Sequence, residues 1–136
     1  MQTFKIAELS GYCPSVLTVL TPFKTCNMCK TVWRDCGSFV ADRSLILNGY
    51  QAFFDNPEDG LILFTHRTAG CCSTLALKAG AFKSLYKGPK HEIVNYGAES
   101  CPGNCLDARN FEACHAHCSL HWVREILQML RAHRVS

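Results

Sequence analysis

The sequence lacks long apolar stretches, and its longest apolar runs, such as residues 61–64, are short. A transmembrane helix needs about 20 consecutive apolar residues, so the sequence predicts no membrane segment. The first ten residues include Glu8, where a secretory signal peptide would have its uninterrupted apolar region. We therefore expect no signal peptide and a cytoplasmic protein.

A strong charge of one sign is also absent. The formal net charge is +3 and the pI is near 8.3, whereas nucleic-acid-binding domains typically combine a pI above about 9 with a clustered basic stripe. Basic residues do gather near the C-terminus, where cations also stabilise the end of a helix through its dipole: Arg124, Arg131, His133 and Arg134. Nucleic acid is therefore the less favoured partner, and a protein partner stays open.

Common catalytic motifs are missing as well. The sequence contains no glycine-rich phosphate loop, no H-E-x-x-H zinc motif and no G-x-S-x-G nucleophile motif. Carboxylates cannot be paired into an acid–base site from the sequence. No catalytic group is therefore assigned on motif grounds.

Cysteine, by contrast, is abundant, with ten in 136 residues. Without a secretion signal, a reducing compartment disfavours stable disulfides, and metal binding or redox chemistry becomes the better interpretation. Free cysteine can also serve as a small buried apolar residue. That explanation fits a few of the ten, but eight lie in close groups.

Strand and turn signals predict an α+β fold with a small antiparallel sheet of hairpins, in one cysteine-rich domain over residues 1–136. The dipeptide Asn48-Gly49 either interrupts one strand or forms a tight hairpin. Residues 55–60 predict a turn between two paired strands, and residues 79–86 predict a short helix. The β-prone runs cover residues 16–21, 44–47, 50–54, 61–66, 73–77 and 91–96.

A long amphipathic helix is predicted at the C-terminus, directly after a cysteine-rich turn. Asn110 is a suitable N-cap residue, so we expect the helix to begin near Asn110 and to end at about His133. Apolar residues recur at helical spacing and form one stripe: Trp122, Val123, Ile126, Leu127 and Leu130.

The main candidate site consists of two C-x3-C pairs separated by eight residues, Cys101 with Cys105 and Cys114 with Cys118. The first pair lies in a Pro-Gly turn, and the second is spaced so that both sulfur atoms share one face of a helix. Four thiolates suit structural zinc and equally an iron–sulfur cluster. We predict one of these two centres, and the sequence does not distinguish them.

Other interpretations of these four cysteines stay open. On a helix, Cys114 and Cys118 would extend the apolar stripe and act as core residues, and disulfides are a further alternative. Core packing gives no reason for Cys101 and Cys105 in a polar turn, which favours the metal. Three nearby histidines are reserve ligands or solvated helix residues: His115, His117 and His121.

A second group is the C-x2-C motif of Cys26 and Cys29, with Cys36 further along. This motif occurs both in zinc knuckles and in dithiol redox sites. Together with the β-prone run before it and a helix expected to open at residues 31–33, it resembles the active-site region of thioredoxin. The resemblance implies redox activity, with the helix dipole lowering a thiol pKa, but the chain lacks that family's βαβ alternation and downstream Thr-Pro.

A third group places His66 shortly before the adjacent Cys71 and Cys72. His66 and a cysteine of the next turn could form a thiolate–imidazole pair for nucleophilic catalysis. They could also supply ligands to the four-cysteine group, or to Cys26 and Cys29. Adjacent residues of a strand point to opposite faces, so at most one of the two cysteines acts with His66.

The leading hypothesis is a small, non-enzymatic metal-binding domain that serves as a sensor, an interaction module or an electron-transfer accessory. One alternative is a thiol redox enzyme or sensor that uses Cys26 and Cys29, or Cys71 with His66. Another is a nucleic-acid-binding regulator that uses the basic C-terminal helix.

Overall fold

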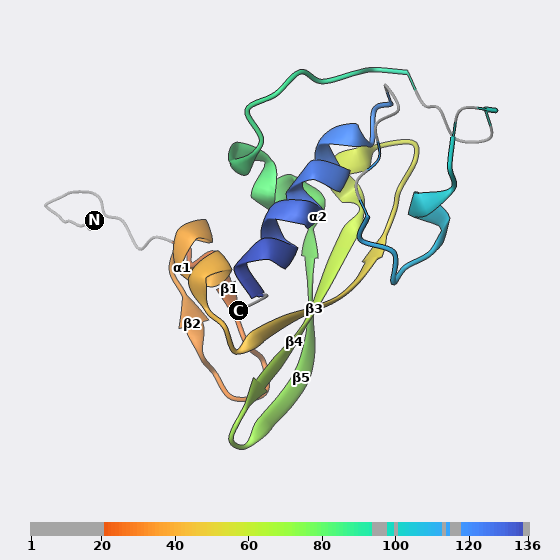
Figure 1. Cartoon of the computed structure of the whole chain (residues 1–136). Coiled ribbons are helices and arrows are strands. Elements are labelled where there is room, and N and C mark those ends of the chain that lie inside the picture. The colour runs from red at the N-terminus through yellow and green to blue at the C-terminus, as the bar shows by residue number, and fades with distance from the viewer. Residues whose placement is uncertain (1–20, 94–97, 100, 113, 115–117, 135–136) are drawn as a thin grey trace, which may run out of the picture. The chain divides into compact units, whose positions relative to one another are not determined.

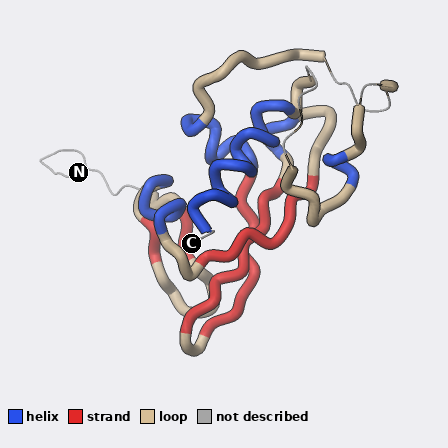
Figure 2. The backbone as a smooth tube through the Cα atoms, viewed as in Figure 1, coloured by secondary structure: helices blue, strands red, loops and turns tan. Residues whose placement is uncertain are grey.

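The computed structural model describes residues 21–93, 98–99, 101–112, 114 and 118–134. Contacts divide the chain into two compact units, Met1–Phe39 and Val40–Ser136. Small antiparallel sheets and a C-terminal helix are present, so the predicted α+β class is confirmed. Figure 1 and Figure 2 show these elements along the chain. Of the β-prone run at residues 16–21, residues 16–20 lie outside the described residues.

The first unit contains a short antiparallel hairpin of β1 (Lys24–Thr25) and β2 (Val32–Trp33), and α1 (Cys36–Ala41) begins after it. Phe39 of this helix is buried, and its ring centroid lies 5.4 Å from that of Phe23 and 5.2 Å from that of Trp33. Aromatic rings at such distances attract one another beyond the area they bury. The three rings therefore form the apolar core that supports the loop between the two strands.

The second unit contains a three-stranded antiparallel sheet in the order β3 (Leu45–Gln51), β4 (Leu61–Thr68) and β5 (Cys71–Lys78). Consecutive strands are neighbours, as expected of hairpins joined by short turns. Side chains alternate between the two faces of a strand. Every second residue of β4 is accordingly buried, on the face that packs into the core: Ile62, Phe64 and His66.

The turn signals of this sheet are largely confirmed. The register between β3 and β4 shifts between Leu47 and Gly49, so the chain forms one strand with a β-bulge there, and the alternative of a tight hairpin is wrong. The turn predicted at residues 55–60 does connect β3 to β4, and Asn56 accepts a hydrogen bond there from the Glu58 amide. A Cβ atom at Gly60 would come 3.1 Å from the Gln51 carbonyl oxygen. This close approach explains why glycine occupies the position.

Helix α2 (His121–Arg134) contacts β3 and the short 3-10 helix η2 (Ala79–Leu85). Figures 1 and 2 show it lying across one face of the sheet of the second unit. Phe64 of the sheet and Phe82 of η2 meet at 6.0 Å between ring centroids. The residues of the apolar stripe are buried in this core: Trp122, Val123, Ile126, Leu127 and Leu130.

The predicted start of the C-terminal helix near Asn110 is wrong. The Asn110 side chain instead accepts a hydrogen bond from the Glu112 amide at 2.9 Å, a local turn that competes with helix formation. The helix begins at His121. The expected strand at residues 91–96 is also not found at residues 91–93, and residues 94–96 lie outside the described part of the chain.

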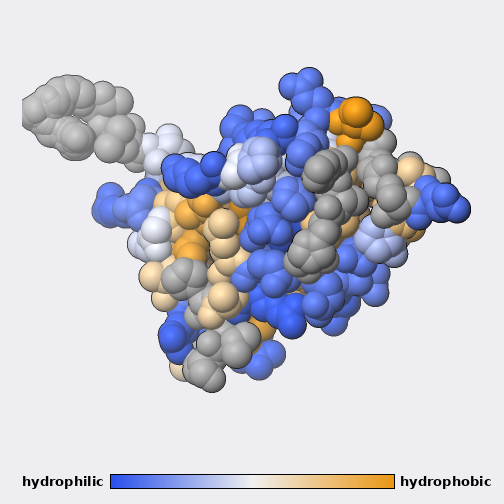
Figure 3. Space-filling model, turned by 45° about the horizontal axis from the view of Figure 1, so that its top comes forward, coloured by the Kyte–Doolittle hydropathy of each residue, from blue (hydrophilic) through white to orange (hydrophobic). Residues whose placement is uncertain are grey.

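No helix within the described residues is long and apolar enough to cross a membrane. On the face drawn in Figure 3, hydrophilic residues cover much of the surface. The large apolar side chains that are exposed come from separate places in the sequence, and single exposed apolar residues are normal on a protein surface: Met28, Val32, Ile46, Phe53, Ile93, Leu106 and Met129.

Candidate metal centre

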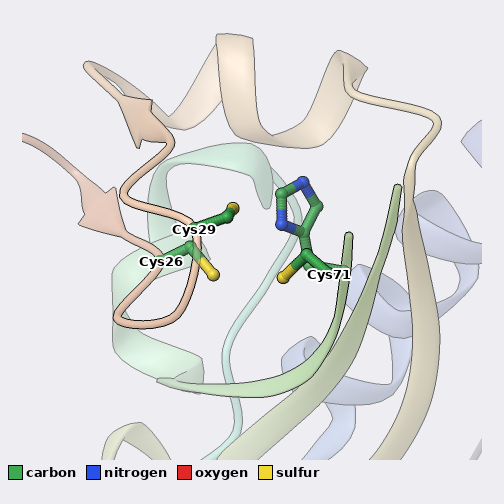
Figure 4. A group of neighbouring side chains, drawn as sticks. Cys26, Cys29 and Cys71 are labelled. Carbon is green, nitrogen blue, oxygen red and sulfur yellow. The ribbon is translucent and has the colours of Figure 1, made fainter. Parts of the chain in front are cut away.

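The C-x2-C motif lies in the turn between β1 and β2. Two backbone hydrogen bonds close this turn, from the Cys26 amide to the Thr31 carbonyl at 2.8 Å and from the Lys30 amide to the Cys26 carbonyl at 2.9 Å. Lys30, directly after the second cysteine, has φ of 67°, a left-handed conformation that lets the chain fold back sharply. Figure 4 shows Cys26 and Cys29 projecting from this turn.

The thioredoxin-like setting expected for this motif is wrong. Residues 32 and 33 pair with β1 as a strand instead of opening a helix. The two cysteines therefore do not lie at a helix N-terminus, where the dipole would stabilise a thiolate. The Cys29 sulfur instead lies 3.1 Å from the Thr31 hydroxyl. A closed turn between two strands is the geometry of a zinc knuckle, the other interpretation of the motif.

Cys36, the third cysteine of this group, occupies the first position of α1. Burial raises the pKa of its thiol, and the negative charge of Asp35 raises that pKa further. Asp35 is held there because its carboxylate caps the helix, accepting a hydrogen bond from the Ser38 amide at 2.8 Å. Both effects favour the neutral form of the Cys36 thiol.

His66 and Cys71 come from the β4–β5 hairpin. His66 is opposite Ser73, and Thr68 is opposite Cys71, so His66 and Cys71 lie on the same face near the end of the hairpin. Both are buried, and the Cys71 sulfur lies 3.3 Å from the Ser73 hydroxyl. Gly70, with φ of 83°, supplies the positive φ that this two-residue turn requires.

The neighbouring Cys72 is exposed on the opposite face of β5. The alternation along the strand therefore separates the two adjacent cysteines as the sequence predicts. Only Cys71 lies on the face of His66. Cys72 is a natural control for any experiment on Cys71.

Cys26, Cys29, His66 and Cys71 each offer one ligand atom, and these atoms all lie within 4.8 Å of one another. Figure 4 shows the labelled cysteines of this group. A tetrahedral zinc ion with Zn–S bonds of about 2.3 Å holds its sulfur ligands about 3.8 Å apart. The limit of 4.8 Å is compatible with the spacing around a bound ion, and the four residues could hold a metal.

No known protein family, curated protein or solved structure matches the chain. The type of metal ion is therefore inferred from the four ligand side chains alone. Three thiols and one imidazole are ligands for soft or borderline metal ions. No carboxylate belongs to the group, so magnesium and calcium, which prefer oxygen ligands, are poor candidates.

The four cysteines predicted as the main site all line one pocket of the second unit. Cys105 lies in the short 3-10 helix η3 (Asn104–Leu106). In the described part of the chain, however, the group built on Cys26 is the one set of three or more such ligands within 4.8 Å of one another. The predicted cysteines thus share a pocket, but no three of their sulfur atoms lie within 4.8 Å of one another: Cys101, Cys105, Cys114 and Cys118.

Cys114 and Cys118 precede α2 instead of lying on it. The expectation that they share a helix face is wrong, and so is the alternative that they extend the apolar stripe of that helix. Of the three reserve histidines, His121 is the first residue of α2 and lines the pocket, with its Nδ1 atom 2.9 Å from the Cys114 carbonyl. The other two lie outside the described residues.

The Arg124 side chain is 1% exposed and also lines this pocket. Its guanidinium donates to the Asn110 carbonyl at 2.9 Å and to the Glu112 carbonyl at 3.1 Å. The prediction that Arg124 belongs to the basic C-terminal group is wrong, because the side chain is buried in the protein interior. Its place beside Val123 in the apolar stripe was the signal for that burial.

Electrostatics link Arg124 to the cysteines of the pocket. Burial raises the pKa of the Cys105 thiol, nearby Cys114 raises it further, and the Arg124 guanidinium acts in the opposite direction. The Tyr50 hydroxyl is buried as well, and burial raises its pKa, with Cys105 contributing to the rise. The pocket therefore gathers thiols around a buried cation.

Proposed function

We propose that the chain is a zinc-binding protein in which Cys26, Cys29, His66 and Cys71 hold one ion. The observation that carries the proposal is the mutual spacing of their ligand atoms, all within 4.8 Å. Zinc favours four nitrogen and sulfur ligands in a tetrahedron, and three cysteines with one histidine are a common structural set. A catalytic zinc site usually keeps one position open for water or substrate. Four protein ligands therefore support a structural ion in a non-enzymatic protein.

The local geometry of the ligands supports zinc over a working dithiol. The C-x2-C turn is closed by backbone hydrogen bonds and lies between strands, so no helix dipole activates its thiols. Ligands far apart in sequence meet only in the folded chain, and metal-binding energy then becomes folding energy. We infer that the ion stabilises the fold, as a small interaction or sensor module requires.

Zinc content of the purified chain tests the proposal. We expect stoichiometric zinc in the wild type, and a severe loss in Cys26→Ser and in His66→Ala, because each removes one of four ligands. Cys36→Ser, a cysteine outside the group, is the control and should keep full zinc. The measurement is zinc per chain by elemental analysis after purification under reducing conditions.

Two outcomes would contradict the proposal. One is a wild-type chain that contains no zinc and does not take it up from a zinc-loaded buffer. The other is full zinc in Cys26→Ser and His66→Ala. Loss of zinc in Cys36→Ser alone would assign the ion to a different group of ligands.

A further inference from the structure

The pocket lined by Cys101, Cys105, Cys114 and Cys118 is a second place where thiols gather. No three of these sulfur atoms lie within 4.8 Å of one another in the described structure, whereas a tetrahedral zinc ion would hold them about 3.8 Å apart. The four thiols therefore line one pocket, but no three of them have the spacing that a single tetrahedral ion requires. A cluster of several metal ions holds its thiolates further apart than a single ion does.

A buried cation lies beside this pocket. The hydrogen bonds that Arg124 makes to oxygen atoms in the described part of the chain go to the backbone of Asn110 and Glu112 and to the Asn110 side chain. Its Nη1 atom is buried and has no hydrogen-bond acceptor among the described residues. A buried charge is costly unless an opposite charge lies close. The pocket thus offers a positive charge and a spare N–H donor to an anionic group.

The Tyr50 side chain is a second indication that the pocket accommodates an anionic group. Its hydroxyl is buried without a hydrogen-bond partner in the described structure, and it interacts electrostatically with Cys105 and Cys118. Buried polar groups in native proteins almost always have a partner. Two donors, Arg124 and Tyr50, are therefore poised near sulfur atoms that would carry negative charge once they bind metal.

We propose that this pocket binds an iron–sulfur cluster through Cys101, Cys105, Cys114 and Cys118, with Arg124 balancing its charge. Four cysteine thiolates are the usual ligands of such clusters, and four-thiolate clusters carry net negative charge. Gly103, with φ of 82°, lets the C-x3-C turn curl between its two cysteines. This proposal uses none of the ligands of the zinc site, so each of the two proposals can be tested and rejected independently of the other.

Iron and acid-labile sulfide analysis on chain purified without oxygen tests the cluster. We expect both elements, with visible absorption, in the wild type, and their loss in Cys101→Ser and in Cys105→Ser. Cys72→Ser, an exposed cysteine outside both groups, should keep the cluster. Zinc per chain should be the same in all four proteins, which separates this result from the test of the zinc site.

Two results would overturn the cluster. The first is a colourless protein that stays free of iron and sulfide after incubation with ferrous iron, sulfide and a thiol reductant. The second is zinc, without iron, that is lost in Cys101→Ser and Cys105→Ser, which would assign a mononuclear tetrathiolate site to the pocket.

The reduction potential of the cluster tests the role of Arg124. Hydrogen bonds and positive charge near the sulfur atoms raise the reduction potential of a cluster. Arg124→Lys keeps the charge but loses the Nη1 donor, so we expect the cluster to remain and its potential to become more negative. An unchanged potential in a chain that retains the cluster would contradict this positioning role. A folded Arg124→Lys chain that no longer holds the cluster would also contradict it, because the positive charge is retained.

Discussion

Replacing Cys71 with serine should remove the zinc and strongly destabilise the fold, while the same change at Cys72 should alter neither property. Cys71 is buried and belongs to the proposed ligand group, whereas its neighbour is exposed on the other face of β5. Structural zinc contributes on the order of 10 kcal/mol to folding. We expect Cys71→Ser to lower the free energy of unfolding by about 4 kcal/mol or more, in the range reached when a metal is lost.

Urea unfolding with and without a zinc chelator measures this effect. Without chelator, Cys71→Ser should unfold at much lower urea than the wild type, and Cys72→Ser should match the wild type. With chelator, all three proteins should become similar, because the ion that distinguishes them is gone. Equal stability of the two variants in zinc-containing buffer would show that Cys71 is not a ligand.

Arg124→Met should also be strongly destabilising, whereas Arg131→Met on the same helix should change little. Arg124 is buried and donates to the Asn110 and Glu112 carbonyls. Hydrogen bonds to a charged group contribute about 1.5–3 kcal/mol each, so we expect a loss of about 3 kcal/mol or more. Arg131 makes an exposed ion pair with the Glu112 carboxylate at 3.2 Å, and such pairs contribute less than about 1 kcal/mol.

Thermal unfolding of the two variants, each compared with wild type, tests this contrast. Both arginines contact Glu112, so a difference between the variants reports burial rather than loss of a positive charge on α2. A similar, small shift in both would mean that Arg124 does not tie the loop before the helix to the core. A large decrease in the unfolding temperature of both variants would mean that the positive charge on α2, and not the burial of Arg124, is what stabilises the fold.

The local features of the sheet could be predicted because their signals are local. The turn predicted at residues 55–60 forms, and Asn56 caps it before Gly60. The alternation of side chains along β5 correctly separates Cys71 from Cys72. Each of these features depends on a few consecutive residues, so composition and spacing are sufficient to find it.

The start of the C-terminal helix and the grouping of the ligands could not be predicted. The first depends on competition between local structures, and the second on residues far apart in the sequence. Asn110 is a good helix cap by type, but its side chain forms a local turn instead, and the sequence gives no measure of which alternative is more stable. The sequence does indicate that His66 and Cys71 could join Cys26 and Cys29 in one site. Distances between ligands that lie far apart in the sequence depend on the folded chain, so the sequence does not show which of these groups can hold one ion.

The central claim is that zinc is bound by three sulfur atoms and one nitrogen atom from Cys26, Cys29, Cys71 and His66. X-ray absorption at the zinc edge of the purified chain measures that coordination shell directly. We predict three sulfur atoms at about 2.3 Å and one nitrogen atom at about 2.0–2.1 Å from the ion, with the nitrogen lost in His66→Ala. A shell of four sulfur atoms that does not change in His66→Ala, or a shell of oxygen and nitrogen alone, would contradict the account.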